Sequence, residues 1–546
     1  MQIGKIKKSI GGAIERFFEL EISPLAWFAG FFGIMALRTF IESFLVRAQY
    51  YTEEKVIIYN IHNLFFFFLI FALIWIFLSL ILKRKPQKLI GLMFWASWII
   101  ILPPIIDIIR TGGGIYWSFY LIGSPSQLWR EFITIFGNLP SGIYYFGSKI
   151  VFIAATILIS GLIYFKTKNI LKTFLSAIVI YGIFFFMGAF PSLFYYACSF
   201  FGKVGSTSQA YAINIMQFYV GSTQIFGLKF SDLGYLMAYN LNLIFYILSF
   251  VLIAALFFMA DKKKFLAVVK NSRFPQIIYH FGLFFIGLGL GFLAYRDNLN
   301  INVFSVSAVL ILLISIWLAW MASVVVNDIN DYKIDSVSNP DRPLPQGIFS
   351  IEEYKQFGII IFTLSLLGGL IIGLKFAALL AIYQFLAWVY SSRPYRLKRF
   401  PLVATFFSAV ASIVILFLGF ILFSGDDNIQ KLSPNIILML LLAFTLSLPV
   451  KDFKDIEGDK KDGVWTIPVV FGEEKGRLIV AIGVFGSFVS SVFFLNDPGL
   501  FFWALLAGAA AFLIIVNQKI NPRRLFWWVL GVVSVYGTIL VKILFL

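Results

Sequence analysis

Long apolar segments separated by short polar connections recur along the whole chain. A helix needs about 20 mainly apolar residues to cross a bilayer, and about fifteen segments reach that length. The first six lie near residues 24–46, 57–82, 89–109, 141–165, 171–192 and 235–259. The other nine lie near residues 277–295, 302–326, 356–374, 376–390, 401–423, 434–450, 475–494, 499–517 and 525–545. The pattern predicts an all-α, multi-pass integral membrane protein.

Composition excludes a soluble alternative. Of the 546 residues, 60% are hydrophobic and only 13% are charged, whereas about a quarter of the residues in a soluble domain are charged. We expect the run of four phenylalanines at 65–68 to face lipid. The segment 1–20 is basic and lacks the compact apolar core of a signal peptide, so we expect an amphipathic helix on the membrane surface.

The net charge of +17 is concentrated in alternate connections. Lys and Arg gather at 83–88, 166–172, 262–273, 393–399 and 519–524. The positive-inside rule makes these connections cytoplasmic and places the N-terminus on the same side. Because the positive charge is spread among apolar spans, nucleic-acid binding is not expected. The composition fits a prokaryotic plasma membrane.

The basic stretch 261–275 separates the first six spans from the last nine. We therefore expect an N-terminal membrane domain at 1–260, a cytoplasmic linker at 261–275 and a second membrane domain at 276–546.

Two of the predicted inner connections are acidic rather than basic. They contain nine of the chain's 27 acidic residues: Asp328, Asp331, Asp335, Asp341, Asp452, Asp455, Glu457, Asp459 and Asp462. Three residues in each follow the spacing i, i+3, i+7, so each trio shares one face if the helix continues through it. Two such faces would repel without cations between them, and Mg²⁺ binds through a few carboxylates together with substrate phosphates. A site for Mg²⁺ and a diphosphate is therefore predicted.

The alternative is that both connections are solvated loops or ion-paired helix ends. The matched spacing favours the metal site over that alternative. A calcium EF-hand is disfavoured, because neither connection has the alternating ligands and closing glutamate of that motif. A zinc site is not expected either, since Cys198, His62 and His280 lie far apart in the sequence and each histidine is expected to be an interfacial or packed residue.

A third inner connection, at 390–399, is basic and contains Tyr390 and Lys398. A cation is expected near a departing diphosphate, where it stabilises the growing negative charge. Inner connections are commonly basic for topological reasons alone, so this segment by itself does not decide the function.

The three connections together resemble the motifs of the UbiA superfamily of intramembrane prenyltransferases. Asn-Asp-x-x-Asp-x-x-x-Asp stands at 327–335, a Tyr-Ser…Leu-Lys segment at 390–398, and Asp-x-x-x-Asp at Asp455 and Asp459. The resemblance covers residues 275–546, and the nine spans of this half also fit the family.

The resemblance implies a nine-helix bundle around a cavity and a Mg²⁺-dependent transfer of an isoprenyl group. The donor would be an allylic polyprenyl diphosphate, and the hydrophobic acceptor an aromatic compound, a tetrapyrrole or a membrane lipid. The implied catalytic residues are Asp328, Asp331, Asp455, Asp459 and Lys398. Of the two expected Mg²⁺ ions, one would be held by Asn327, Asp328, Asp331 and Asp335, and the other by Asp455 and Asp459. Further substrate contacts would come from Asn327, Tyr390, Tyr395, Arg342 and Asp452.

Residues 1–260 resemble no family that we identify. Arg38 with Glu42 and Asp107 with Arg110 are ionisable residues in or beside spans, which makes them functional candidates. We favour ion pairs that hold helices together. An accessory domain that moves a lipid substrate is the hypothesis for this half.

A cation-coupled transporter or lipid flippase is the rival function for the whole chain. Transporters place coupling carboxylates near the bilayer midplane, often in broken helices. The acidic residues here lie at the ends of the spans, which favours the enzyme. A scaffold with a degenerate transferase half is a third possibility, and the intact aspartates argue against it.

Overall fold

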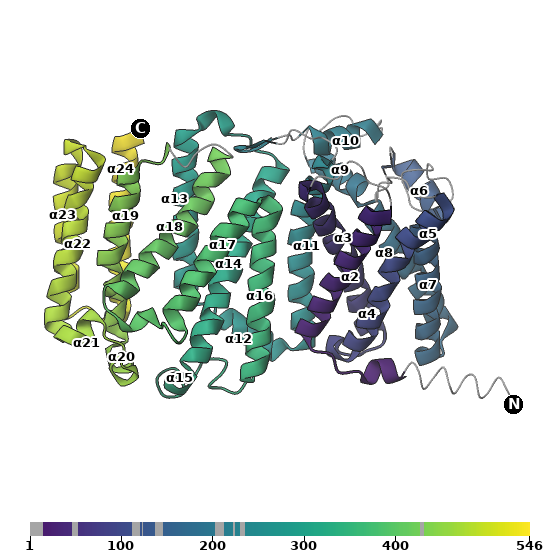
Figure 1. The fold of residues 1–546 in the computed structure, drawn as a ribbon, viewed down its shortest axis with the longest axis horizontal. Helices are drawn as coiled ribbons and strands as arrows, with labels where there is room; N and C mark the ends of the chain where they lie inside the picture. Colours follow the sequence, from purple (N-terminus) through teal and green to yellow (C-terminus); the bar gives the residue numbers. More distant parts are fainter. Residues whose placement is uncertain are drawn as a thin grey trace. The chain divides into compact units, whose positions relative to one another are not determined.

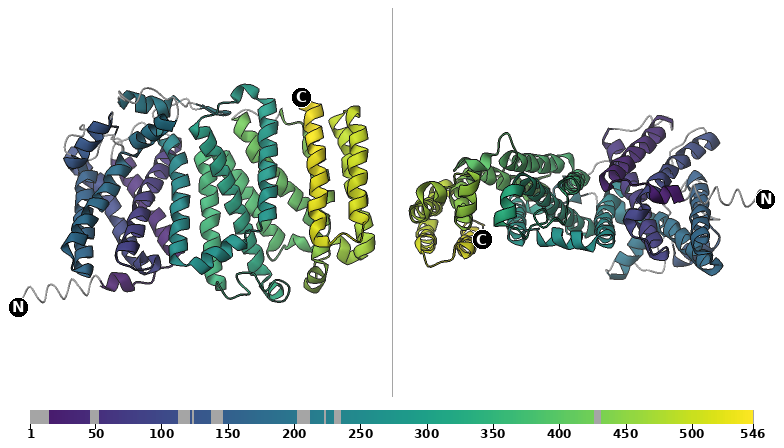
Figure 2. Two further views of the ribbon diagram at one scale, coloured as in Figure 1. Left: turned by 180° about the vertical axis from the view of Figure 1, so that it is seen from behind. Right: turned by 90° about the horizontal axis from the view of Figure 1, so that it is seen from below.

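The structure, a computed structural model, is almost entirely helical and describes residues 15–45, 53–111, 121–122, 124–136, 146–201, 212–221, 224–229, 235–425 and 431–545. The first fourteen residues of the expected amphipathic helix lie outside the described residues. Among the described residues, 15 helical segments are long and apolar enough to cross a membrane. Each overlaps one of the predicted segments, so the predicted all-α multi-pass architecture is confirmed. Within each part of the chain the long helices run side by side (Figure 1; Figure 2).

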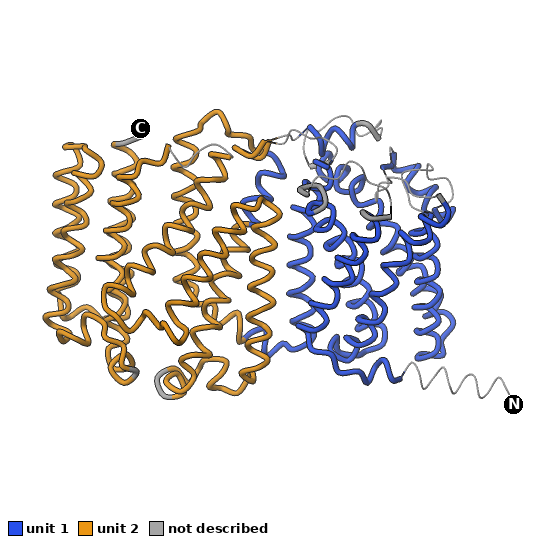
Figure 3. The backbone as a smooth tube through the Cα atoms, viewed as in Figure 1, with its two compact units in different colours: residues 1–223, 230–266, 302–311 blue, residues 224–229, 267–301, 312–546 orange. Residues whose placement is uncertain are grey.

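The chain divides into two compact units (Figure 3). Unit 1 contains residues 1–223, 230–266 and 302–311, and unit 2 contains residues 224–229, 267–301 and 312–546. The change from unit 1 to unit 2 at 266–267 falls within the expected linker. That 1–260 and 276–546 act as separate domains stays a prediction.

Unit 1 is built from helices that the apolar segments predict, with shorter helices between them. Its described elements are α2 (Pro24–Leu45), α3 (Glu53–Ile81), η1 (Pro86–Leu89), α4 (Ile90–Ala96), η2 (Ser97–Ile101), α5 (Leu102–Thr111), α6 (Pro125–Ile133), α7 (Phe146–Thr167), α8 (Ile170–Gly188), α9 (Phe190–Phe201), α10 (Ala212–Val220) and α11 (Leu236–Ala260). The third span is made of four short pieces, η1 to α5, with Pro103 and Pro104 in the first turn of α5. Proline lacks a backbone N–H, so it is tolerated in a first turn and interrupts a longer helix.

The phenylalanine run at 65–68 lies inside unit 1, so the expectation that it faces lipid is wrong. Phe65, Phe66, Phe67 and Phe68 are each at most 8% exposed. Their helix α3 contacts α2, α8 and α11. A helix that is apolar on every side has no polar face to mark its orientation, so its sequence cannot tell lipid from a neighbouring helix.

Buried polar residues of unit 1 hold its helices together. Arg38 and Glu42 form an ion pair at 2.6 Å within α2, so the pair itself does not join two helices as expected, but Glu42 also accepts a hydrogen bond from Asn63 of α3. Asp107 accepts the backbone N–H of Gly147 at 2.7 Å.

Unit 2 contains the remaining helices and one small hairpin. After α12 (Lys262–Lys270), which spans the division, its elements are α13 (Phe274–Ala294), η4 (Arg296–Asn298), α14 (Val303–Asn330), α15 (Tyr332–Ser338), α16 (Ile351–Ile372), α17 (Leu374–Ser391), η5 (Leu397–Arg399), α18 (Val403–Ser424), α19 (Pro434–Ser447), η7 (Leu448–Lys454), α20 (Ile456–Asp462), α21 (Ile467–Phe471), α22 (Glu473–Leu495), η8 (Pro498–Leu500), α23 (Phe501–Val516) and α24 (Pro522–Phe545). The first residues of α14, up to 311, are grouped with unit 1. The strands β1 (Gln224–Ile225) and β2 (Leu228–Lys229) pair antiparallel, with Gln224 opposite Lys229.

Helices α13 and α18 pack closely because glycines face the contact. A Cβ atom added to Gly287 would lie 1.9 Å from the carbonyl oxygen of Leu416, and one added to Gly419 would lie 2.1 Å from that of Phe284. Small residues allow such close backbone approach between membrane helices.

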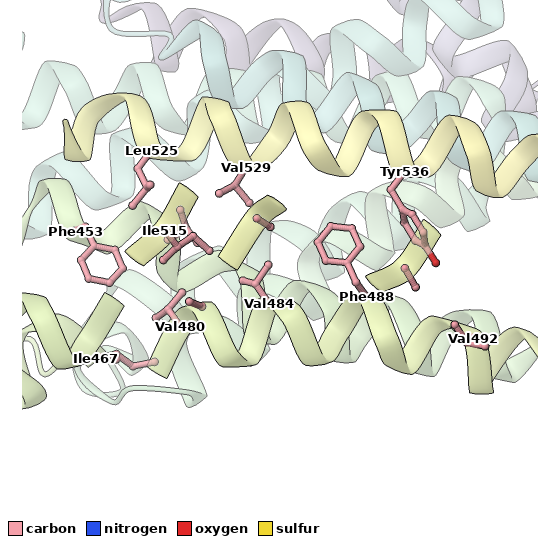
Figure 4. Close-up of a cluster of buried hydrophobic side chains, with 14 of the residues drawn as sticks. Phe453, Ile467, Val480, Val484, Phe488, Val492, Ile515, Leu525, Val529 and Tyr536 are labelled. Carbon is pink, nitrogen blue, oxygen red and sulfur yellow. The ribbon is translucent and has the colours of Figure 1, made fainter. Parts of the chain in front are cut away.

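The last three long helices of unit 2 share an apolar core with η7 (Figure 4). Phe453 of η7 packs against buried residues such as Val480 of α22, Ile515 of α23 and Leu525 of α24. Since Phe453 lies between Asp452 and Asp455, this core fixes the position of the second acidic connection.

Candidate active site

A cavity of about 1590 Å³ lies within unit 2. The predicted site residues in its wall are Asn327, Arg342, Asp331, Asp335, Tyr390, Lys398, Asp452, Asp455 and Asp459. Apolar and aromatic side chains of the spans form much of the remaining wall, including Trp320, Leu386, Phe407 and Trp527. The structure therefore brings the three predicted connections to one cavity. Their short helices α15 and α20 contact each other and lie at the same end of unit 2 (Figure 1).

The helix does not continue straight through either acidic connection. Helix α14 ends at Asn330, and α15 begins after Asp331, whose backbone has φ −100° and ψ 8°. The second connection is interrupted at Asp455, with φ −116° and ψ 12°, between η7 and α20. Each break falls at the middle aspartate of its trio. The expectation of one uninterrupted face per trio is therefore not met.

Asp328 is turned away from the cavity. It is 1% exposed and does not belong to the cavity wall. Its carboxylate accepts hydrogen bonds from Arg273 at 2.6 Å, Asn271 at 2.8 Å and the Tyr354 hydroxyl at 3.3 Å. Arg342 lies 3.4 Å away. In this arrangement Asp328 ties the start of α13 to the end of α14.

Asp331 points to the cavity, where two cations hold its carboxylate. Lys398 pairs with it at 2.5 Å and Arg396 at 3.0 Å. The Lys398 ammonium also donates to the side-chain oxygen of Asn327 at 3.4 Å, and the Ser391 hydroxyl donates to the same oxygen at 3.3 Å. The basic connection and the first acidic connection are thus joined at the cavity wall.

Asp335 is buried beside Arg342. The two side chains form an ion pair, and the Asn339 side chain donates to Asp335 at 3.0 Å. Burial raises the pKa of the Asp335 carboxyl, and the neighbouring Arg342 guanidinium opposes this by lowering it. The paired, charged form is the one that can bind a cation.

The second acidic connection is more open than the first. Asp455 is 60% exposed, and its nearest cation, Lys454, lies 3.8 Å away. Asp452 and Asp459 are half-buried and line the same cavity. Asp455 is therefore free of strong ion pairing and available to a cation from the cavity.

Among the described residues, no three His, Cys, Asp or Glu side chains lie close enough together to hold a metal ion by themselves. Mg²⁺ does not need such a cage, because it binds through one or two carboxylates together with water and substrate phosphates. The donor set is all oxygen, which suits Mg²⁺. Paired carboxylates from two connections in one cavity fit Mg²⁺ that arrives with a diphosphate.

The two predicted tyrosines have different positions. Tyr390 lines the cavity, and the Lys451 ammonium lies 5.9 Å from the centre of its ring. Tyr395 is 56% exposed, packs edge-on against Trp388 and is not part of the cavity wall.

The two histidines are buried and hydrogen-bonded, each within one unit. His62 bonds to Asn242 at 3.1 Å. His280 lies beside the Gln276 carbonyl, which can only accept, so its Nδ1 carries the proton. Its Nε2 then accepts from the Tyr383 hydroxyl at 2.9 Å.

Several residues at the site were missed by the sequence reasoning. Asn271 and Arg273 lie in the expected linker, where the positive charge of Arg273 is explained by topology alone and nothing singles out the neutral Asn271. Arg396 belongs to the basic connection at 390–399, and Lys451 directly precedes the second acidic trio. Each basic connection contains several Lys and Arg residues. Nothing in the sequence alone marks which of them reaches a carboxylate.

The chain is similar to known proteins both in sequence and in structure. The sequence model of the UbiA prenyltransferase family matches residues 282–530, nearly all of which belong to unit 2. Digeranylgeranylglyceryl phosphate synthase of Methanothermobacter thermautotrophicus is 30% identical over 213 residues, which are 38% of this chain and 72% of the relative.

The enzyme of the same name from Methanosphaera stadtmanae is 29% identical over 161 residues, which are 29% of this chain and 55% of the relative. The chain thus spans little more than half the length of that relative. A solved UbiA homolog from Archaeoglobus fulgidus, bound to GPP and Mg²⁺, is 19% identical with a TM-score of 0.37, covering 50% of this chain and 97% of that one. A likeness with so low a TM-score adds nothing to the sequence matches.

Proposed function

Because the chain belongs to the UbiA prenyltransferase family, we propose that unit 2 transfers an isoprenyl group from an allylic polyprenyl diphosphate to a hydrophobic acceptor. The observation that carries this proposal is the single cavity whose wall includes both acidic connections, Lys398 and many apolar side chains of the spans. A diphosphate needs the polar part of such a cavity, and its isoprenyl chain needs the apolar part.

Asp331 and Asp335, with Asn327, are the proposed ligands of one Mg²⁺ ion, and Asp455 and Asp459 are those of a second. Bound Mg²⁺ supplies positive charge that stabilises the leaving diphosphate. Asp328 can join the first set only by exchanging its present partners, Arg273 among them, since its carboxylate is fully hydrogen-bonded.

The chain's own cations hold and stabilise the diphosphate. Lys398 and Arg342 pair with Asp331 and Asp335, so they stand where the donor's phosphate oxygens would meet the carboxylates. The allylic C–O bond breaks with both electrons leaving on the diphosphate oxygen, and these cations stabilise the charge that develops there. A carbocation remains on the isoprenyl chain.

The apolar wall protects that carbocation from water. Trp320, Phe407 and Trp527 line the cavity and offer aromatic faces to a cation. An acceptor nucleophile, oxygen or carbon, then forms the new bond with the cation and loses a proton. Exclusion of water is required because water would otherwise take the acceptor's place.

The acceptor class and the cellular location are the finer parts of this proposal. Aromatic, tetrapyrrole and lipid acceptors all suit an apolar cavity, and the names of the two relatives favour a lipid glyceryl phosphate. The basic connections of the sequence favour a cytoplasmic active site in a prokaryotic plasma membrane.

The test is diphosphate release by the purified full chain in lipid nanodiscs. Allylic diphosphates of increasing length are supplied with a native lipid extract, with and without Mg²⁺. Asp331→Asn and Asp459→Asn are expected to lower release by about 100-fold or more, the usual loss on removing a group that stabilises transition-state charge. Asp341→Asn is the matched control, because Asp341 belongs to the same connection but is exposed and outside the cavity wall.

Mass spectrometry of the prenylated product would then identify the acceptor. Absence of Mg²⁺-dependent release with every donor would refute the proposed function and would make transport the next activity to test.

A further inference from the structure

Lys451 is a cation in the cavity wall that forms no ion pair with the residues the structure describes. It belongs to η7 and is half-buried. Within the described part of the chain it makes no ion pair, and its ammonium lies 5.9 Å from the centre of the Tyr390 ring. Lys398 and Arg342, by contrast, are paired with aspartates of the first acidic connection. A half-buried ammonium that lacks a direct partner favours an anion from outside the chain.

The cavity wall around Lys451 offers neutral groups able to form hydrogen bonds as well as the carboxylates of Asp452 and Asp459. Tyr279, His280 and Tyr390 line the same cavity as Lys451. Tyr279 and Ser412 share a hydrogen bond of 2.9 Å, and both line the cavity. Asp452 and Asp459 also lie within electrostatic range, so the local field is not purely positive. One cation with neutral hydroxyls suits a singly substituted phosphate or a carboxylate better than a diphosphate with its metal ions.

The donor diphosphate already has sufficient partners elsewhere. The proposed metal ligands and Lys398 belong to the polar connections. Tyr279, His280 and Ser412 belong to the spans α13 and α18 and not to the polar connections. An acceptor with an anionic group on an apolar body would meet Lys451 there.

We propose that Lys451, with Tyr279 and Tyr390, forms the subsite that binds the anionic group of the acceptor, a phosphate monoester or a carboxylate. This subsite deepens the proposed function and rests on it for the identity of the acceptor. It makes Lys451 a determinant of acceptor specificity rather than a residue of the diphosphate site.

The test is binding to the full chain in nanodiscs, which does not require turnover. The probes are a long-chain alkylglyceryl phosphate and the matching uncharged alkylglycerol. The wild-type chain is expected to bind the alkylglyceryl phosphate more tightly than the alkylglycerol. Lys451→Gln is expected to reduce phosphate affinity by about 10- to 100-fold, the loss expected for one charge-assisted hydrogen bond, and to leave alkylglycerol binding unchanged.

Two further variants separate the effect of the Lys451 charge from a general disturbance of the fold. Lys451→Arg keeps the charge and should retain most of the preference for the phosphate. Lys475→Gln removes an exposed lysine of α22 outside the cavity wall and should change neither affinity. If Lys451→Gln keeps the wild-type ratio of the two affinities, the subsite does not exist.

The donor is tested in the same nanodiscs with an allylic thiodiphosphate, which is cleaved slowly, and with inorganic pyrophosphate. Lys451→Gln should bind both as the wild type does. Weaker binding of both, with phosphate-lipid binding unchanged, would assign Lys451 to the donor and overturn the inference. Lack of turnover in every variant, with the lipid preference intact, would refute the proposed enzyme and leave an anionic-lipid site.

Discussion

Arg477 offers a sharp test of how the second acidic connection is supported. The side chain is 1% exposed and reaches the end of helix α23. It donates to the backbone carbonyls of Ile515 at 3.2 Å, Asn517 at 3.0 Å and Ile520 at 3.3 Å. These carbonyls belong to the last turn of α23 and the segment after it, where helix geometry leaves backbone acceptors without partners.

Arg477→Met keeps most of the side chain's volume and removes every one of these donors. The Ile515 carbonyl is buried, and a buried acceptor left unsatisfied costs about 1–3 kcal/mol. The Asn517 segment is more exposed, so water can replace part of that loss. The ion pair with Glu473 adds little, because the Glu473 side chain is 50% exposed and exposed pairs contribute about 0–1 kcal/mol. We expect the variant to lose about 3 kcal/mol of unfolding free energy.

The assay is denaturant or thermal unfolding of the purified chain in detergent, with Lys475→Gln as control. Glu473→Gln should cost less than about 1 kcal/mol, which separates the carbonyl bonds from the ion pair. Because the Arg477 guanidinium also lies 5.6 Å from the Phe453 ring, the variant should release the second acidic connection and lower Mg²⁺-dependent activity. A loss below about 1 kcal/mol for Arg477→Met would show that solvent or repacking replaces the buried donors.

Three further predictions follow from other contacts. Gly287→Val should separate α13 from α18 and destabilise the protein by about 3 kcal/mol or more. Gly282→Val is the control and should not destabilise the protein, because a Cβ added there meets no atom within 4 Å. Equal melting temperatures of the two variants would contradict the close approach of α13 and α18. A double-mutant cycle of Arg273→Gln and Asp328→Asn, read from unfolding, should give a coupling of about 1.5–3 kcal/mol, and additive effects would exclude the interaction. Chelation of Mg²⁺ should abolish diphosphate release. Asp455→Asn should raise the Mg²⁺ concentration for half-maximal release about 10-fold or more. If that Mg²⁺ concentration is unchanged in the variant, Asp455 does not belong to the metal site.

Much of the candidate site could be located from the sequence. Asn327, Asp331, Asp335, Lys398 and Asp459 were all placed at one site, and all line the same cavity. Their spacing and their position at the ends of apolar spans carried this prediction, because span ends on one side of a membrane must lie at similar depth.

Other assignments depended on local backbone geometry that spacing does not reveal. Asp328 shares the spacing of its trio, but the helix breaks at Asp331, and Arg273, Asn271 and Tyr354 hold Asp328 outside the cavity. Tyr395 belongs to the same connection as Lys398 and is nevertheless exposed.

The sequence by itself determined the number and approximate limits of the membrane helices. Apolar segments of this length must leave water whatever their neighbours are, so composition and length suffice. The sequence also determined that two acidic connections and one basic connection lie among the last nine spans.

Only the tertiary structure decided which apolar faces meet protein, as the buried run at 65–68 shows. Lipid and a packed helix are equally apolar, so hydropathy cannot distinguish them. Tertiary structure likewise decided which cations form ion pairs with aspartates, as Lys398 and Arg396 do, and which line the cavity with no ion pair to a described residue, as Lys451 does. Ion pairing depends on side-chain distances of a few ångströms between segments far apart in the chain, and no local pattern specifies those distances.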